Sequence, residues 1–184
     1  MPGPKFLTGE AVSLRPIEDE DVGFLRDGVN DPAIWRAMER ATPASGAEQR
    51  ETVAELREND ATVPFLVTTR QSRVGFVSLT ELNDNWGNAA LSFWIAPDQQ
   101  GEGYGAEAVA LAVEYAFEHR RLHKLIAHTI ALNDASIGLL ESIGFEREGR
   151  HRDEAFVDGE YHDLLAFGLL EDEWCEDRSA ATDS

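Results

Sequence analysis

The stretch Pro97–Ala106, which reads PDQQGEGYGA, places three glycines two residues apart, where an apolar run ends and a helical pattern begins. These are Gly101, Gly103 and Gly105. A glycine inside a helix costs about 1 kcal/mol relative to alanine. Directly before a helix, however, glycines let the backbone approach a ligand, and the free N–H groups and positive dipole end of the helix can hold an anion. The stretch predicts a loop that binds pyrophosphate without basic side chains.

The sequence of the loop excludes two common classes of phosphate-binding loop. No Gly-Lys-Ser or Gly-Lys-Thr occurs in it, which excludes the phosphate loop of nucleotide hydrolases. The third glycine comes too early for the dinucleotide-binding fingerprint, and the loop follows three predicted strands. A connector without a ligand is the alternative interpretation. The strand before the loop and the amphipathic helix after it favour a binding loop.

On both sides of the loop, hydrophobic periodicity and turn residues predict a mixture of helices and strands. We expect helices within Glu18–Asp31 and Ala47–Asn59, from the glycines to about Arg120, and from Asn133 to a stop at Gly144, with a loop over 41–50. A turn is expected at VDGEY. The expected strands are Val12–Ile17, Pro64–Arg70, Arg73–Leu82, Asn88–Pro97, Lys124–Ala131 and Leu164–Leu169. Hairpins with one strand–helix–strand crossover imply a mixed sheet.

Length and cysteine content indicate one domain in a reducing compartment. The chain has 184 residues, and we expect a single domain over 1–174 followed by a disordered acidic tail over 175–184. The single cysteine, Cys175, excludes an internal disulfide and is interpreted as incidental. No apolar run approaches the roughly 20 residues of a membrane span, and the N-terminus does not resemble a signal peptide. We therefore expect a cytoplasmic protein.

The charge of the chain is strongly acidic. Thirty-five acidic residues face sixteen basic ones, the net charge is −19, and the lysines are Lys5 and Lys124. The negative electrostatic potential of such a chain argues against nucleic acid as a partner, and no membrane partner is expected. Acid spread along the chain is typical of a protein that works in molar salt, where the Debye length falls to about 3 Å. We expect a halophilic protein, with an acidic mesophilic one as the alternative.

Two motifs and the C-terminal segment of the chain resemble those of a known enzyme family. The segment FWIAPDQQGEGYGAEAV resembles the acetyl-coenzyme-A loop of the GCN5-related N-acetyltransferase (GNAT) superfamily, and Gln100, Gly103 and Gly105 match its Gln/Arg-x-x-Gly-x-Gly/Ala pattern. The segment NDASIGLLESIGFEREG resembles the later motif of that family, with Asn133 and Ser136 in place. The segment DGEYHDLLAFGLLEDEW resembles the C-terminal part of the RimJ/RimL branch, which acetylates ribosomal-protein alanine and related amines.

The resemblance implies the fold, the co-substrate and the reaction. It implies an α+β fold with a mixed, mostly antiparallel sheet of about seven strands, flanked by helices and splayed at the acetyl-CoA site. Acetyl-CoA would be the co-substrate, no metal would take part, and a primary amine would attack the thioester directly. The acceptor would be a peptide N-terminus or, as the alternative, a small amine such as a polyamine or an aminoglycoside. A homodimer formed through the meander strands is a further expectation.

The same resemblance implies a set of coenzyme-binding residues. The backbone of the strand before the loop would hold the pantetheine arm, and the amides of the loop would hold the pyrophosphate. At least one aromatic side chain of that strand is expected only to fill the core. The implied residues are Phe93, Trp94, Ile95, Gln100, Gly101, Glu102, Gly103, Tyr104, Gly105, Ala106, Asn133 and Ser136.

Catalytic roles are less fully matched. The family often has a tyrosine that acts as the general acid at the position of Leu140 in this chain. Without it, Ser136 is the candidate proton donor. Alternatively, Ser136 only forms hydrogen bonds at the start of the helix. Glu81 and Glu154 are the candidate bases, and water is the alternative. Tyr161 and His162 are expected near the acceptor. A coenzyme-binding module without catalysis, or an interaction domain without coenzyme, are the competing classes of function.

Overall fold

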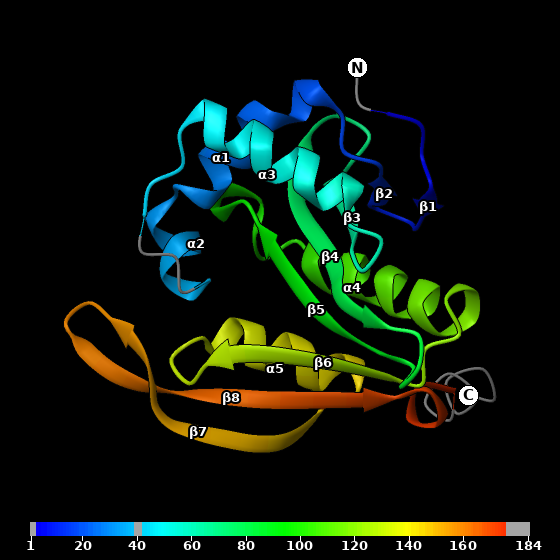
Figure 1. The fold of residues 1–184 in the computed structure, drawn as a ribbon, viewed down its shortest axis with the longest axis vertical. Coiled ribbons are helices and arrows are strands. Elements are labelled where there is room, and N and C mark those ends of the chain that lie inside the picture. Colours follow the sequence, from blue (N-terminus) through cyan, green and yellow to red (C-terminus); the bar gives the residue numbers. More distant parts are fainter. Residues whose placement is uncertain (1–2, 39–41, 176–184) are drawn as a thin grey trace.

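The computed structural model describes residues 3–38 and 42–175 and contains an eight-stranded sheet in the order β1-β2-β3-β4-β5-β6-β8-β7 (Figure 1). Every neighbouring pair is antiparallel except β5 and β6, which run parallel. The expected mixed, mostly antiparallel sheet is thereby confirmed, and its extra strand is the two-residue β1. The strands are β1 Leu7–Thr8, β2 Ser13–Arg15, β3 Val63–Thr68, β4 Arg73–Asn83, β5 Asn88–Ile95, β6 Lys124–Ile130, β7 Glu146–Val157 and β8 Glu160–Leu170.

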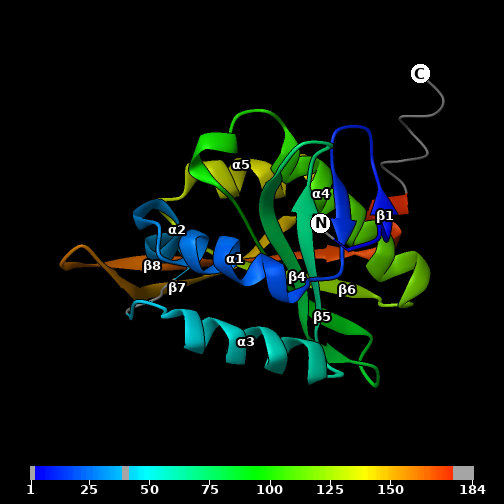
Figure 2. The ribbon, with the colours of Figure 1, turned by 90° about the horizontal axis from the view of Figure 1, so that it is seen from above.

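Helices cover both faces of the sheet (Figure 2). The helices α4 and α5 lie on one face, and α1 and α3 lie on the other. The π-helical turn Tyr115–His119 extends α4 close to the expected end at Arg120. The helices are α1 Val22–Val29, which follows a 3-10 turn at Asp19–Asp21, α2 Pro32–Ala37, α3 Gly46–Glu58, α4 Tyr104–Glu114 and α5 Asp134–Ile143.

Helix caps explain where the prediction was right and where it was wrong. Asn133 accepts the Ser136 N–H and starts α5, and Gly144 ends it with a φ of +106°, both as expected. The expected loop over 41–50 is wrong at its end, because the Ser45 hydroxyl and the Glu48 carboxylate form a capping box that starts α3 at Gly46. The short helix α2 was not expected. Asp31 caps it and Pro32 begins it.

The last two strands form a long hairpin. The expected strand Leu164–Leu169 is only the inner part of β8, which pairs with all of β7. The turn between them is Asp158-Gly159, with φ values of +51° and +94°, as the VDGEY segment predicts. Asp163 pins the outer part, because the Asp153 N–H donates to its carboxylate at 3.0 Å and Arg150 pairs with it. These contacts lower the pKa of the Asp163 carboxyl, the backbone hydrogen bond most.

The parallel pair β5 and β6 is paired at one end only. The register joins Asn88 with Lys124, Ala89 with Leu125 and Ala90 with Ile126, and no pair follows, although β5 continues for five more residues. The two strands therefore diverge from Ala90 onward, as Figure 1 shows. The opening lies between the two halves of an otherwise continuous sheet.

The structure also bears on the expected dimer, the expected tail and membrane-spanning helices. The meander strands β3, β4 and β5 lie inside the sheet, whose outer strands are β1 and β7, so a second copy could not extend the sheet at the meander. Cys175 ends a helical stretch at 171–175 and does not begin the tail, and the rest of the expected tail, 176–184, lies outside the described residues. Within the described part of the chain, no helix is long and apolar enough to cross a membrane.

A second, smaller core beneath α1 holds Trp94, which is 6% exposed and packs with Phe24 and Phe76. The indole also lies directly against Gly28 of α1. A Cβ on Gly28 would stand 2.2 Å from Cη2 of Trp94. The absence of a side chain at position 28 thus permits α1 to approach the strand that borders the opening.

We expect Gly28→Ala to destabilise the fold by about 1–3 kcal/mol, because the added methyl overpacks the indole contact. Gly23→Ala in the same helix is the matched control, because nothing lies within 4 Å of its Cβ position. There, the helix propensity of alanine should leave stability unchanged or raised by up to about 1 kcal/mol. Urea unfolding followed by tryptophan fluorescence measures both. Equal stabilities of the two variants would contradict this account of Gly28.

Candidate active site

The opening between β5 and β6 exposes a row of backbone hydrogen-bonding groups. The Ala96 N–H donates to the Val74 carbonyl at 2.8 Å, so even-numbered residues of β5 direct their backbone groups to β4. Because this direction alternates along a strand, Leu91, Phe93 and Ile95 direct theirs towards β6. The Ala90–Ile126 pair still engages the Leu91 N–H, and beyond it the divergence leaves the Leu91 carbonyl and the backbone groups of Phe93 and Ile95 without a strand partner. They form an edge to which an extended ligand can bind as a short strand would.

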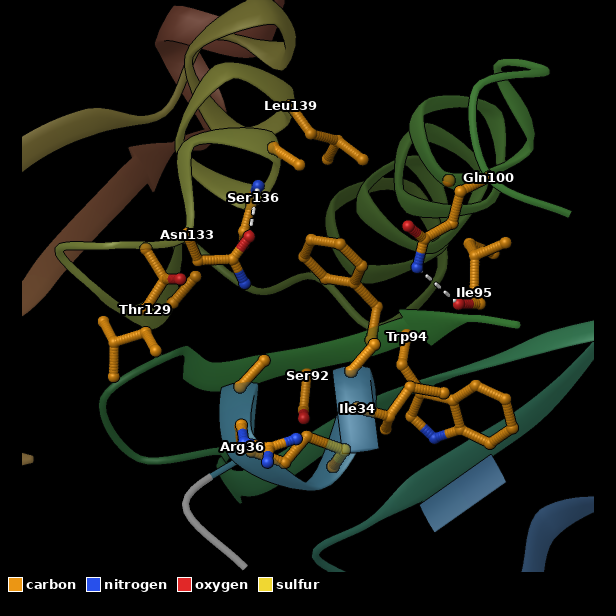
Figure 3. A pocket seen from close by; sticks show the side chains of 18 of the residues that line it. Ile34, Arg36, Ser92, Trp94, Ile95, Gln100, Thr129, Asn133, Ser136 and Leu139 are labelled. Atoms are coloured by element: carbon orange, nitrogen blue, oxygen red, sulfur yellow. Dashed lines mark hydrogen bonds between the residues drawn. The ribbon is translucent and has the colours of Figure 1, made fainter. Parts of the chain in front are cut away.

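One end of this edge is anchored to the glycine loop. The Gln100 side chain donates its amide N–H to the Ile95 carbonyl at 2.9 Å (Figure 3). This hydrogen bond satisfies the last outward carbonyl of β5 and fixes the start of the loop against the strand. Gln100 therefore connects the unpaired edge with the loop that follows.

The three glycines have two distinct roles. Gly101 and Gly103 have φ values of +82° and +81°, a left-handed conformation that costs other residues about 1–2 kcal/mol. Gly103 is the N-cap of α4, so the free N–H groups of the first helical turn face the loop. Gly105 serves close packing, because a Cβ there would stand 3.0 Å from Cδ1 of Leu139 in α5 and that side chain would have to shift. The loop and helix form an anion-binding N-terminus without a basic side chain.

These elements border one pocket of about 980 Å³ (Figure 3). Its walls are β5, the glycine loop and the start of α4, the outer half of β6, the start of α5, helix α2, and the turn between β7 and β8. On the α5 wall, Asn133, Ser136 and Leu139 face the pocket, opposite Gln100. Leu140 is 1% exposed and belongs to the main core, so the position of the family tyrosine offers no side chain here.

The wall on the α2 side carries an ion pair. Arg36 Nε lies 2.8 Å from Asp158 Oδ1 in the hairpin turn, and an Arg36 Nη donates to the Pro32 carbonyl at 3.0 Å. The pair joins α2 to the β7–β8 turn across 122 positions of sequence. Its side chains are 38% and 63% exposed, so solvent screens it and its contribution to stability is small. The rest of this wall is mainly apolar, with Ile34 and Met38.

Most of the sequence-predicted coenzyme residues meet at this pocket. Trp94 directs its backbone to β4 and fills the second core, as expected of at least one aromatic residue of the strand. Glu102 is exposed and does not line the pocket. The predicted residues that line it are Phe93, Trp94, Ile95, Gln100, Gly101, Gly103, Tyr104, Gly105, Ala106, Asn133 and Ser136.

The candidate bases lie elsewhere. Glu81 is exposed at an irregularity of β4, with a φ of +54°, and Glu154 is exposed on β7. Neither lines the pocket, and neither do Tyr161, which is 65% exposed, and His162. The structure does not bring these four residues to the site.

Three ionisable pocket residues were missed by sequence reasoning: Arg36, His128 and Asp158. Arg36 and Asp158 lie far apart in the chain, and only the folded hairpin brings them together. His128 had a readable signal, since it interrupts the apolar segment KLIAHTIA of a predicted buried strand. No group of three or more His, Cys, Asp or Glu able to hold a metal occurs in residues 3–38 and 42–175.

Comparison with known proteins agrees with this geometry. Residues 12–146 match the family described as Acetyltransferase (GNAT) domain. The spermidine N(1)-acetyltransferase of Vibrio cholerae is 28% identical over 89% of this chain and 95% of its own length. The Bacillus subtilis protein named "Putative ribosomal N-acetyltransferase YdaF" is 35% identical over 90% of this chain and 94% of its own. The crystal structure of the Vibrio cholerae enzyme with CoA and spermine has a TM-score of 0.86 at 27% identity, covering 91% of this chain and 99% of that one.

The chain therefore belongs to the GNAT acetyltransferase family. It is an acyltransferase that uses acetyl-CoA to acetylate an amine. The residues present suit that co-substrate on two independent observations. The unpaired edge of β5 offers N–H and C=O groups in the alternation that the two amides of a pantetheine arm require. The left-handed glycines and the N-terminus of α4 suit its pyrophosphate.

Glu102 places a carboxylate inside the anion-binding loop, next to the left-handed Gly101 and Gly103. We expect Glu102→Gln to tighten CoA binding about two- to fivefold at low salt, because an exposed like charge is removed. The difference should vanish near 1 M KCl, where exposed charges are screened. For the same reason, CoA should bind the unmodified protein better as KCl rises.

Isothermal titration calorimetry with CoA at several KCl concentrations measures both effects. Glu51→Gln, an equal change of charge on the exposed face of α3, is the matched control. Equal CoA affinities of the two variants at low salt would contradict the role of Glu102. Affinity of the unmodified protein that falls steadily with KCl, while the fold stays intact, would contradict the salt prediction.

Proposed function

We propose that this chain acetylates a primary amine of a small aliphatic acceptor, with polyamines as the leading class, by direct attack of the amine on acetyl-CoA. The observation that carries the proposal is the unpaired edge of β5, which ends at the glycine loop on one side and borders the α2 wall on the other. An extended thioester and an amine can meet there from opposite faces of the sheet.

The coenzyme side is formed by the edge and the loop. Phe93 and Ile95 would bind the pantetheine arm through their backbone, and the loop from Gly101 to Ala106 would bind the pyrophosphate. Bound there, acetyl-CoA supplies an activated acetyl group on a thiol leaving group. The N–H of Phe93, on the unpaired β5 edge, would donate to the carbonyl oxygen as it gains negative charge.

The α5 wall would assist the leaving group. Ser136 lines the pocket within the first turn of α5, where Asn133 holds its backbone N–H at 3.1 Å. Its hydroxyl would donate a proton to the departing thiolate, because Leu140 is buried and offers none.

The acceptor would enter along the α2 wall. The aliphatic part of a small amine suits Ile34 and Met38, and Asp158 offers a carboxylate for an ammonium. The similarity to the spermidine N(1)-acetyltransferase and to the structure with CoA and spermine supports polyamines as the class. The acidic chain, with a net charge of −19, would attract cations of this kind over long range at low salt.

The N-terminus of a peptide is the second candidate acceptor. It is favoured by the 35% identity to the protein described as a ribosomal N-acetyltransferase and by the C-terminal segment DGEYHDLLAFGLLEDEW. A peptide N-terminus also carries one reactive ammonium, so the same wall could hold it.

Release of CoA, followed with a thiol reagent, tests the acceptor class. The panel contains spermidine, spermine, an aminoglycoside, and peptides that begin with Ala, Ser or Met, at low and at molar KCl. The exposed Cys175 is first replaced by Ser to remove background thiol. We expect release with the polyamines. Release only with peptides would transfer the assignment to the second candidate, and no release from a protein that binds acetyl-CoA would overturn catalysis.

The ion pair on the acceptor wall gives a second test of the acceptor charge. We expect Arg36→Gln to lower KM for spermidine about two- to fivefold, because a like charge is removed and Asp158 becomes free for an ammonium. The comparison acceptor is a peptide that begins with Ala and has its N-terminal ammonium as its one positive charge, and its KM should change less than that of spermidine, which carries several. A KM for spermidine that is unchanged or raised, with thermal stability intact, would contradict a cationic acceptor at this wall.

A further inference from the structure

The titratable side chains among the described residues that line the pocket are Arg36, Tyr104, His128 and Asp158. Arg36 and Asp158 form an ion pair, and Tyr104 begins α4 on the coenzyme side. Histidine is the side chain whose ordinary pKa lies nearest to neutrality, and it commonly acts as a general base. We propose that His128 is the general base that removes a proton from the acceptor ammonium. This inference rests on the proposed function.

Strand register places His128 beside the reacting groups. Ala90 pairs with Ile126, so the same register continued by two residues sets His128 across the opening from Ser92. The Phe93 N–H, which would hold the acetyl carbonyl, belongs to the residue next to Ser92. His128 therefore lies at the level of the chain at which the acetyl group would be transferred.

The direction of the side chain puts His128 on the acceptor face. In β6, Leu125 and Ala127 point into the core beneath α4 and α5, so His128 points to the opposite face, the one that bears α1–α3. In β5, Trp94 packs into the core of that same face, so Ser92, two residues away, points there as well. Figure 3 shows Ser92 on the side of the pocket that holds Arg36 and Ile34. An amine that enters along α2 therefore meets the face of the pocket on which His128 lies.

The surroundings of His128 leave its ring available. Its neighbour on the sheet is Ala166 of β8, and the ring of His151 on β7 lies 6.3 Å away. On the same strand face, Lys124 is paired with Glu148 at 2.6 Å, and across the pocket Arg36 is paired with Asp158. His128 is exposed, so a proton that it accepts can pass to solvent after each turnover.

The step balances without a further reactant. The imidazole of His128 takes one proton from the ammonium and becomes imidazolium, and the free amine nitrogen forms a bond with the thioester carbon. As the carbon–sulfur bond breaks, the sulfur takes the electron pair and the Ser136 hydroxyl proton and leaves as CoA thiol. The nitrogen loses its second proton to water, the Ser136 oxygen regains a proton from water, and imidazolium releases its proton to water. The products are the amide, CoA thiol and one proton.

This assignment replaces Glu81 and Glu154 by a residue that lines the pocket. A base must meet the acceptor amine, and Glu81 and Glu154 do not line the pocket. Replacement of His128 should therefore impair catalysis, and replacement of either glutamate should not. His151→Gln is the matched control, since it removes a neighbouring ring from the same face of the sheet without changing the pocket lining.

The experiment measures kcat/KM against pH for the unmodified protein and for His128→Gln, His151→Gln, Glu81→Gln and Glu154→Gln, with spermidine and the peptides that begin with Ala, Ser or Met. We expect His128→Gln to lose about a hundredfold or more in kcat/KM near neutral pH and to lose the acidic limb of the profile. The other three variants should stay within about threefold. CoA affinity should be unchanged in all of them, which separates loss of the base from loss of the coenzyme site.

A readout without turnover accompanies this comparison. The ring NMR signals of His128 and His151 are assigned by their loss in the two variants, and CoA is then added together with the acceptor that shows turnover. The His128 signal should shift on addition of the acceptor, and the His151 signal should shift less.

The possible results are separable. Turnover by the unmodified protein, with a pH profile unchanged in His128→Gln, would overturn the base assignment and leave the proposed function standing. An equal loss in His151→Gln would also overturn it. If the unmodified protein acetylates no acceptor of either class, the proposed function fails and the base assignment fails with it.

Discussion

The function of this fold depends on one interrupted ladder of hydrogen bonds. A parallel pair of strands usually continues as far as its strands do, and here the pair of β5 and β6 stops at Ala90 and Ile126. The backbone groups beyond that point are strong donors and acceptors that favour a partner. Since the neighbouring strand has diverged, a ligand can take its place. Flanking elements keep the opening in place: Gly28 lets α1 pack on Trp94, and Gln100 holds Ile95.

The loop at the end of the interrupted ladder provides the positive potential that the phosphates of the coenzyme require. A coenzyme with several phosphates would ordinarily favour lysine or arginine in its loop, yet the loop contains Glu102 and no cation. The left-handed Gly101 and Gly103 and the first turn of α4 supply positive potential from the backbone instead. A chain with a net charge of −19 can in this way hold an anion locally without changing its acidic surface.

Local features of the site could be predicted from sequence because they depend on neighbours along the chain. The strand–loop–helix unit around Gly103 and the cap at Asn133 follow from turn chemistry within a few residues. The helix α2 was missed because six residues between a capping Asp31 and Ala37 give too short a pattern to recognise. The helix expected over Ala47–Asn59 agrees with α3 to within one residue, but the loop expected over 41–50 extends too far, because the capping box of Ser45 and Glu48 outweighs the small, polar composition around it. The Arg36–Asp158 pair could not be predicted at all, because it depends on where a distant hairpin turn folds.

The positions of Glu81 and Glu154, outside the pocket lining, show a more general limit of prediction from sequence. In a chain with 35 acidic residues, the presence of a carboxylate near a motif carries little information, because most carboxylates form the solvated surface. Glu81 is a candidate from its place near the end of a strand that faces the acceptor in this fold, and Glu154 from a family glutamate that aligns one position later, at Ala155. Both are exposed and do not line the pocket. A histidine inside an apolar strand is a rarer event, and it requires a structural or chemical reason. His128 is such a residue: it is exposed in a strand whose alternate side chains are buried, at the level where the sheet opens. In this strongly acidic chain, the polar interruption of a buried strand marks a pocket residue, whereas the two glutamates do not line the pocket.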